Sequence, residues 1–172
     1  EACAVLDPKR LDSTYPYKEL SGCGIGFKLI TALQIYRNLP FEPLLEYLDL
    51  VAISIAADVV PLMDENRVLA YYGLKKINRQ PRAGLEAILS YANVKHEERI
   101  SDKLYFNREL TLSDLVFLIG PRINAAGRME SGRLSVELLK AKKMADAVEV
   151  AAKIEEHNKD RKQKDKEITK QA

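Results

Sequence analysis

The stretch LDLVAISIAADVVPL, from Leu48 to Leu62, decides what fold we expect. Its middle, Leu50 to Ala57, is a nearly continuous apolar run that is too short to cross a membrane and is rich in β-branched residues. Such runs are typical of a strand buried on both faces, usually in a parallel sheet covered by helices. We therefore expect an α/β fold, a mostly parallel sheet flanked by helices, with this strand at its centre.

One carboxylate, Asp58, directly follows the predicted strand, and Pro61 ends it. In open α/β sheets, ligands bind just beyond the carboxyl ends of the strands. A carboxylate at that place is positioned to hold a metal ion. The alternative is an N-cap or turn aspartate, because Asp is common in both roles. The position alone leaves both interpretations open.

The other elements follow from apolar periodicity and from helix start and stop residues. A second strand is expected over residues 2–6, ended by Asp7 and Pro8. Thr111 and Asp114 have the spacing of a capping box at a helix start. A polar, irregular surface segment is expected over residues 93–108. The expected helices cover about 22–37, 42–47, 65–78, 84–91, from 111 onwards, 134–139, and from 145 to the end.

The start of the first helix, SGCGIGF, is rich in glycine. It is not the dinucleotide-binding fingerprint, because its third glycine comes one residue early. A glycine-rich helix start can bind phosphate through free N–H groups, whereas close packing against another helix is the plainer explanation. We prefer the packing explanation.

A second informative stretch is GPRINAAGRM, Gly120 to Met129, where proline and glycine are expected to produce a loop. It carries Arg122, Asn124 and Arg128 among small residues. Guanidinium groups match the geometry of phosphate oxygens, and small neighbours allow close approach. The alternative is that the arginines pair with carboxylates across a domain interface.

Length and composition set further bounds. The chain has the size of one ordinary domain, and its net charge of +2 indicates no particular partner. Cys3 and Cys23 lack metal-ligand spacing and are expected to be reduced, buried thiols of a cytoplasmic protein. Beyond Ile154, Ile168 is the clear apolar residue of the last helix. A helix without an apolar face cannot pack in a core, so we expect an exposed interdomain connector.

Several pieces together resemble the RecJ family, the single-strand-specific DNA exonucleases of the DHH phosphoesterase superfamily. They are AVLDPKR, YPYKELSGCGIGFKL, LDLVAISIAADVVPL, ENRVL and IGPRINAAGR, in the order of the family. The resemblance covers almost the whole chain. It implies 5′-to-3′ hydrolysis of single-stranded DNA in repair and recombination.

The resemblance also implies cofactors and site residues. The family uses a pair of divalent ions, Mn²⁺ or Mg²⁺, held by aspartates and histidines. Asp58 corresponds to the last aspartate of that metal set. Arg122 and Asn124, with Arg128, match a loop near the scissile phosphate. There the guanidinium of Arg122 would offset charge that develops in the transition state.

The family's organisation implies that this chain is a fragment. Residues 1–143 would be the later half of the DHH catalytic domain, and residues 144–172 would be the connector helix. The upstream Asp-rich and DHH motifs and the later substrate-binding domain are not in this sequence. We therefore expect little activity from the fragment alone, and self-association through apolar surface that has lost its cover.

Two other functions stay open at this point. A different DHH phosphoesterase could act on oligoribonucleotides or cyclic dinucleotides with the same metal chemistry. A non-catalytic DHH protein could serve as a scaffold in a repair assembly. Intact upstream motifs in the parent sequence would argue against the scaffold.

Overall fold

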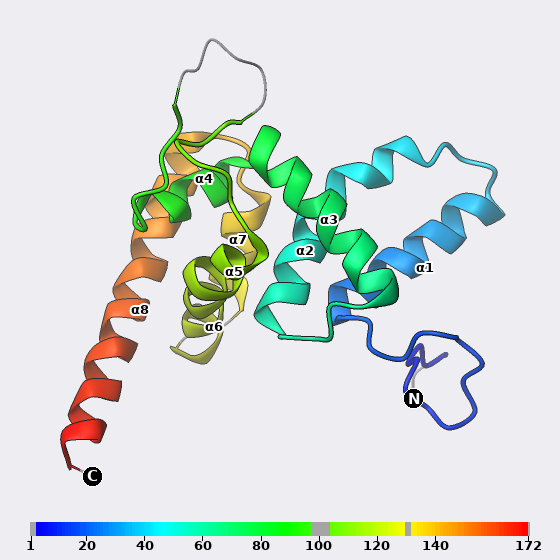
Figure 1. Cartoon of the computed structure of the whole chain (residues 1–172), viewed down its shortest axis with the longest axis horizontal. Coiled ribbons are helices and arrows are strands. Elements are labelled where there is room, and N and C mark those ends of the chain that lie inside the picture. Colours follow the sequence, from blue (N-terminus) through cyan, green and yellow to red (C-terminus); the bar gives the residue numbers. More distant parts are fainter. Residues whose placement is uncertain (1–2, 98–103, 130–131, 172) are drawn as a thin grey trace. The chain divides into compact units, whose positions relative to one another are not determined.

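The computed structural model describes residues 3–97, 104–129 and 132–171, without the side chains of residues 128, 129 and 171. The chain divides into two compact units, residues 1–76 and 77–172. Over the described residues both units are built from helices, and they contain no β-sheet (Figure 1). The expected α/β fold with a mostly parallel sheet is therefore wrong for this chain.

The first unit holds α1 (Gly22–Tyr36), the 3₁₀ helix η1 (Glu42–Tyr47), α2 (Leu48–Ala57) and the larger part of α3 (Asp64–Arg79). The helix α2 packs against α1 and η1. It is the apolar stretch that we expected to be the central strand.

The reason for this error lies in the burial of α2. The consecutive residues Val51, Ala52 and Ile53 are at most 4% exposed, and neighbouring residues of an α-helix point about 100° apart. A helix buried nearly all round shows no apolar periodicity, so its sequence cannot be told from that of a buried strand. Alanine is the strongest helix former and supports the helical form here.

The second expected strand is also absent from the described residues. Cys3 to Leu6 form no regular structure, and Val5 and Leu6 are more than half exposed. The turn expected at Asp7 and Pro8 is present. In it, the backbone N–H of Lys9 donates to the Asp7 carboxylate at 2.9 Å.

The second unit holds the end of α3, α4 (Ala83–Ser90), the short α5 (Leu112–Asp114), the π-helical turn η2 (Leu115–Ile119), α6 (Gly120–Met129), α7 (Arg133–Lys140) and α8 (Met144–Gln171). The long helix α8 packs along α4, α6 and α7. Its side chains Ala147, Ala151 and Ile154 are fully buried, whereas Ile168 is 66% exposed. The connector role of residues 144–172 stays a prediction.

Gly120 to Met129 form a helix and not the expected loop. Pro121 lies inside a helical run that continues without a break from α5 through η2 into α6. The preceding π-helical turn accommodates the proline, because a proline ring clashes with the carbonyl four residues earlier in a regular α-helix. The proline is therefore accommodated inside a helical run and does not end it.

Close helix packing falls on other glycines than the ones we expected. A Cβ at Gly22 or Gly26 of α1 would meet nothing within 4 Å, and one at Gly24 would meet Ser21 and Leu20 of the segment before the helix, at 3.3 and 3.4 Å. A Cβ at Gly73 would overlap the Leu48 carbonyl, and one at Gly84 would overlap the carbonyl of Leu138. The glycines of α3 and α4 therefore let these helices approach α2 and α7 closely.

Most of the expected helices and the capping box are confirmed. Helices lie over 22–36, 64–79, 83–90, 133–140 and 144–171. Thr111 and Asp114 bond each other's backbone N–H groups, at 2.8 and 3.3 Å. Cys3 is exposed and Cys23 half-buried, so the thiols are less buried than expected. Within the described residues, no helix combines the length and hydrophobicity needed to cross a membrane.

Candidate functional site

Asp58 ends helix α2 in the first unit, and its side chain is exposed. Its backbone N–H bonds the Ser54 carbonyl, and the Ser54 hydroxyl donates to Asp58 Oδ2 at 3.1 Å. Ser54 Oγ in turn accepts from the backbone N–H of Cys23 in the first turn of α1 (3.4 Å). The Ser54 hydroxyl of α2 thus orients the carboxylate, and the backbone of α1 in turn bonds that hydroxyl.

Asp58 caps the C-terminal end of α2 and begins a turn, so of the two alternative roles the N-cap does not apply and the turn position does. A carboxylate is unfavourable at this end, where the helix dipole is negative. A bound cation would remove that disadvantage. The turn after Asp58 is unusual as well, since Val59 has a φ of 51°, a left-handed conformation that β-branched residues rarely adopt.

Arg122 lies on α6 in the second unit and is only 6% exposed. Its Nε donates to Glu155 Oε2 of α8 at 2.6 Å, and its Nη1 donates to the Leu118 carbonyl, also at 2.6 Å. Two of its donor groups are therefore fixed by the protein. This pairing agrees with the carboxylate alternative for the arginines, although both residues lie within one unit.

Asn124 is exposed on α6, and it does not share a face with Arg122. Two residues of an α-helix that are two positions apart point about 200° away from each other. Arg128 belongs to the same helix, but its side chain lies outside the described residues. The structure therefore places the predicted substrate residues on one helix without gathering them into one cluster.

The described residues contain no group of three or more His, Cys, Asp or Glu side chains that could hold a metal ion. Asp58 is thus a single carboxylate, which fits one ligand position of a hard cation and not a whole site. Asp58 lies in the first unit, and Arg122 and Asn124 lie in the second.

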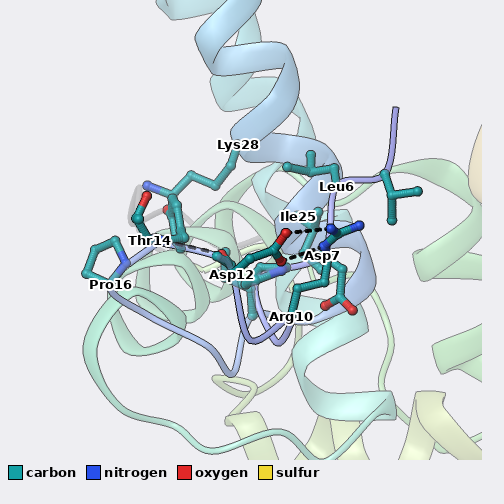
Figure 2. A pocket seen from close by; sticks show the side chains of 13 residues that line it. Leu6, Asp7, Arg10, Asp12, Thr14, Pro16, Ile25 and Lys28 are labelled. Carbon is teal, nitrogen blue, oxygen red and sulfur yellow. Dashed lines mark hydrogen bonds and ion pairs between the residues drawn. The ribbon is translucent and has the colours of Figure 1, made fainter. Parts of the chain in front are cut away.

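Sequence reasoning missed a pocket of about 670 Å³ in the first unit. Its walls come from the N-terminal segment and the start of α1, with Asp7, Arg10, Thr14 and Lys28 among its lining residues (Figure 2). Apolar side chains complete the wall, Leu20 and Ile25 among them. The sequence offered no signal for it, because the segment reads as an ordinary polar loop.

The cations of this pocket are already paired. Figure 2 shows the Arg10 guanidinium joined to Asp12 by two bonds, of 2.6 and 2.8 Å. Burial acts to lower the pKa of Lys28, but the ion pair with Glu65 and the contact with Tyr15 together raise that pKa above its ordinary value. Burial and a 2.7 Å hydrogen bond to Glu65 raise the pKa of Tyr15. The pocket therefore offers a phosphate no unpaired positive charge on these residues.

Sequence reasoning also missed three hydrogen-bonding residues, namely Glu155, Asn66 and Tyr17. Glu155 was seen only as part of a charged helix, and its contact with Arg122 spans 33 residues of sequence. Asn66, inside ENRVL, is fully buried, and its amide donates to the Tyr17 hydroxyl at 3.1 Å. A polar residue inside a conspicuous motif was the available signal for Asn66.

Comparison with known proteins gives the class of this chain. No family model matches it. RecJ of Haemophilus influenzae is 39% identical over 170 residues, covering 94% of this chain and 28% of the relative. RecJ of Bacillus subtilis is 37% identical over 169 residues, covering 98% of this chain and 19% of the relative. Both relatives are named single-stranded-DNA-specific exonucleases.

Solved structures agree with these relatives. The crystal structure of Thermus thermophilus RecJ in complex with Mn²⁺ has a TM-score of 0.75 and 28% identity, over 92% of this chain and 22% of that chain. A crystal structure of exonuclease RecJ bound to manganese has a TM-score of 0.73 and 29% identity, over 37% of that chain. The chain belongs to the RecJ family, as its sequence pieces indicated. It spans roughly a quarter of the length of the Haemophilus relative.

Proposed function

We propose that this chain forms part of a metal-dependent exonuclease that degrades single-stranded DNA from its 5′ end, in DNA repair and recombination. The relatives named as single-stranded-DNA-specific exonucleases match nearly the whole chain. The neighbouring RecJ structures hold Mn²⁺ or Mg²⁺, and we propose the same cofactors here.

The observation that carries the proposal is the exposed carboxylate of Asp58 at the C-terminal end of α2. Hard divalent cations prefer carboxylate oxygens, and a cation would also offset the negative end of the helix dipole. Bound divalent ions would activate a water and stabilise the leaving oxygen of a phosphodiester. Asp58 would supply one ligand, and the remaining ligands would come from outside these 172 residues.

For the substrate we propose roles on α6. Arg122 would offset charge that develops on the scissile phosphate, and Asn124 and Arg128 would bind the strand. The Glu155 contact supports the role of Arg122, because a guanidinium held in a fixed orientation needs no reorganisation during the reaction. Asn124 is exposed and can donate from its amide to a phosphate oxygen.

The test uses the longer protein that we expect to contain this chain, with 5′-phosphorylated single-stranded DNA and Mn²⁺. Asp58→Ala should abolish degradation and weaken Mn²⁺ binding while leaving the fold intact. Asp160→Ala, an exposed carboxylate of α8, is the control and should be as active as the unmodified protein. Full activity of Asp58→Ala would make Asp58 a structural turn residue. Inactivity of the unmodified protein would favour the scaffold.

A second variant examines Arg122. Arg122→Lys keeps a positive charge opposite Glu155 but loses the planar fork that matches phosphate. Turnover should fall while the melting temperature stays within a few degrees. Turnover equal to that of the unmodified protein would restrict Arg122 to holding α6 against α8.

The 172-residue chain alone should show little or no nuclease activity, because one carboxylate seldom holds a hard divalent ion tightly. Incubation of the purified chain with single-stranded DNA and Mn²⁺ measures this directly. Mn²⁺-dependent degradation would mean that the metal site is complete within the chain.

A further inference from the structure

We propose that Asn66 and Tyr17 are positioning residues that hold the turn after Asp58 in the conformation that presents its carboxylate. This inference rests on the proposed metal-ligand role of Asp58. It concerns neither Asp58 itself nor the residues of α6. It assigns a role to two side chains that have no part in the proposed metal or substrate contacts.

Asn66 lies in the first turn of α3 and is fully buried. Its Nδ2 group faces three oxygen acceptors: the Glu19 carbonyl at 2.7 Å, the Pro61 carbonyl at 3.0 Å and the Tyr17 hydroxyl at 3.1 Å. These acceptors belong to two segments far apart in sequence, residues 17–19 and the turn that follows α2. One amide thus joins both segments to the start of α3.

Tyr17 adds a second hold on the same turn. Its hydroxyl donates to the Pro61 carbonyl at 3.1 Å, so that carbonyl accepts from both side chains. Pro61 stands three residues after Asp58. On the other side of Asp58, Ser54 bonds the carboxylate directly. The short segment from Asp58 to Pro61 is therefore held at both ends.

The held segment contains the left-handed Val59, whose side chain is 74% exposed. Packing of this side chain cannot compensate for its unfavourable backbone. Such a conformation persists only where the surroundings enforce it, and it is found often at functional sites. In this structure, the hydrogen bonds to the Pro61 carbonyl and to the Asp58 carboxylate hold Val59 in this conformation.

Only the nitrogen of the Asn66 side-chain amide has hydrogen-bond partners. Its Oδ1 is buried and has no hydrogen-bond partner in the structure. A buried acceptor without a partner is destabilising, and in native proteins it calls for an explanation. We infer that the amide donor is retained for its hold on the turn, although the oxygen beside it stays unsatisfied.

The test measures Mn²⁺ affinity by calorimetry in the longer protein. Asn66→Ala removes the amide, and Tyr17→Phe removes only the hydroxyl, so the milder variant stays informative if the first does not fold. We expect Asn66→Ala to weaken Mn²⁺ binding about tenfold or more, as for other residues that orient a metal ligand, and Tyr17→Phe to weaken it less. Binding within twofold of the unmodified protein in both folded variants would overturn the inference.

A rescue variant separates positioning from simple stabilisation. Glycine adopts left-handed backbone without steric cost. In a Val59→Gly protein the turn should therefore depend less on the hydrogen bonds from Asn66 and Tyr17 to the Pro61 carbonyl. Added to Tyr17→Phe, Val59→Gly should restore a measurable part of the lost Mn²⁺ affinity. A double variant that binds Mn²⁺ no better than Tyr17→Phe alone would count against the strained turn as the link.

Asn78→Ala is the matched control, since Asn78 is also a buried asparagine of α3. It bonds the backbone of Leu110 in the second unit, at 2.7 and 2.9 Å. This variant should lose stability but keep its Mn²⁺ affinity. If Asp58→Ala also leaves Mn²⁺ binding unchanged, the proposed function fails. If only Asp58→Ala weakens it, the metal role of Asp58 stands and the role of Asn66 and Tyr17 fails.

Discussion

Arg122 and Glu155 form a salt bridge whose side chains are 7% and 9% exposed. Burial of two charges is costly, and it is compensated only when each charge keeps its partner and its hydrogen bonds. Removal of either side chain therefore leaves an unpaired buried charge. The resemblance to the family drew attention to Arg122, whereas the structure shows that Glu155 matters as much for its placement.

This pair gives a prediction for single residues. Glu155→Ala should destabilise the chain by about 3–5 kcal/mol, because Arg122 is left buried without its partner. The neighbouring Glu156 is exposed, and Glu156→Ala should change stability by less than about 0.5 kcal/mol. Urea unfolding followed by circular dichroism measures both. Equal effects of the two variants would show that Arg122 finds another partner.

Among the elements, the contact between α2 and α3 depends on a residue without a side chain. A Cβ at Gly73 would overlap the Leu48 carbonyl and lie 2.6 Å from the Ala52 Cβ. Backbone cannot move aside as the end of a flexible side chain can. The close approach of these helices is therefore specific to glycine at position 73.

The corresponding prediction compares two glycines in helices. Gly73→Ala should destabilise the chain by about 1–3 kcal/mol through overpacking. Gly26→Ala should be neutral or stabilising by up to about 1 kcal/mol, because alanine is the better helix former and nothing obstructs its Cβ. Thermal unfolding distinguishes them. A Gly73→Ala protein as stable as Gly26→Ala would mean that α3 shifts without cost.

The start of α5 depends on a charged cap. Bonds from Arg108 (2.7 and 2.9 Å), together with those from Thr111, lower the pKa of Asp114 below its ordinary value of 3.8. A carboxylate with a lowered pKa stabilises the folded state fully above its unfolded pKa. That contribution is lost as the pH falls below 3.8 toward the folded pKa.

Asp114→Asn should therefore lower stability at pH 7, by about 1 kcal/mol for a lost cap. Near pH 3 the gap between variant and unmodified chain should become smaller, because part of the native contribution is gone there. Melting temperatures at both pH values measure this, with Asp160→Asn as an exposed control. A gap that does not depend on pH would exclude the charge of Asp114 as the cause.

For the molecule as a whole, apolar surface on the first unit is the feature with consequences. Leu29, Leu33 and Tyr36 share one face of α1 by helical spacing, and they are 57%, 46% and 85% exposed. Exposed apolar side chains that gather on one helix face promote association. The 172-residue chain should therefore self-associate as its concentration rises.

Analytical ultracentrifugation over a concentration series measures this. Replacing Leu29 and Tyr36 together by serine should shift the chain toward the monomer without loss of helix content. Ile168→Ser on α8, which removes an isolated exposed apolar residue, is the control and should leave the association unchanged. A monomer at all concentrations would contradict the prediction.

The sequence by itself determined the features that depend on neighbours in the chain. Helical spacing and stop residues predicted α1, α3, α4 and α7 closely. The capping box of Thr111 and Asp114 was also local, and it is confirmed. The ordered pieces that resemble the RecJ family predicted the family that the relatives establish.

Tertiary structure alone decided the rest. Leu48 to Ala57 became a helix and not a strand, because burial on all sides erased the periodicity that separates the two. Whether Pro121 ends the helix or is accommodated within it depended on the π-helical turn before it. The partner of Arg122, the close approach at Gly73 and the hold of Asn66 on Pro61 join residues that local sequence does not relate. Such contacts are set by packing in three dimensions, and no pattern of neighbouring residues records them.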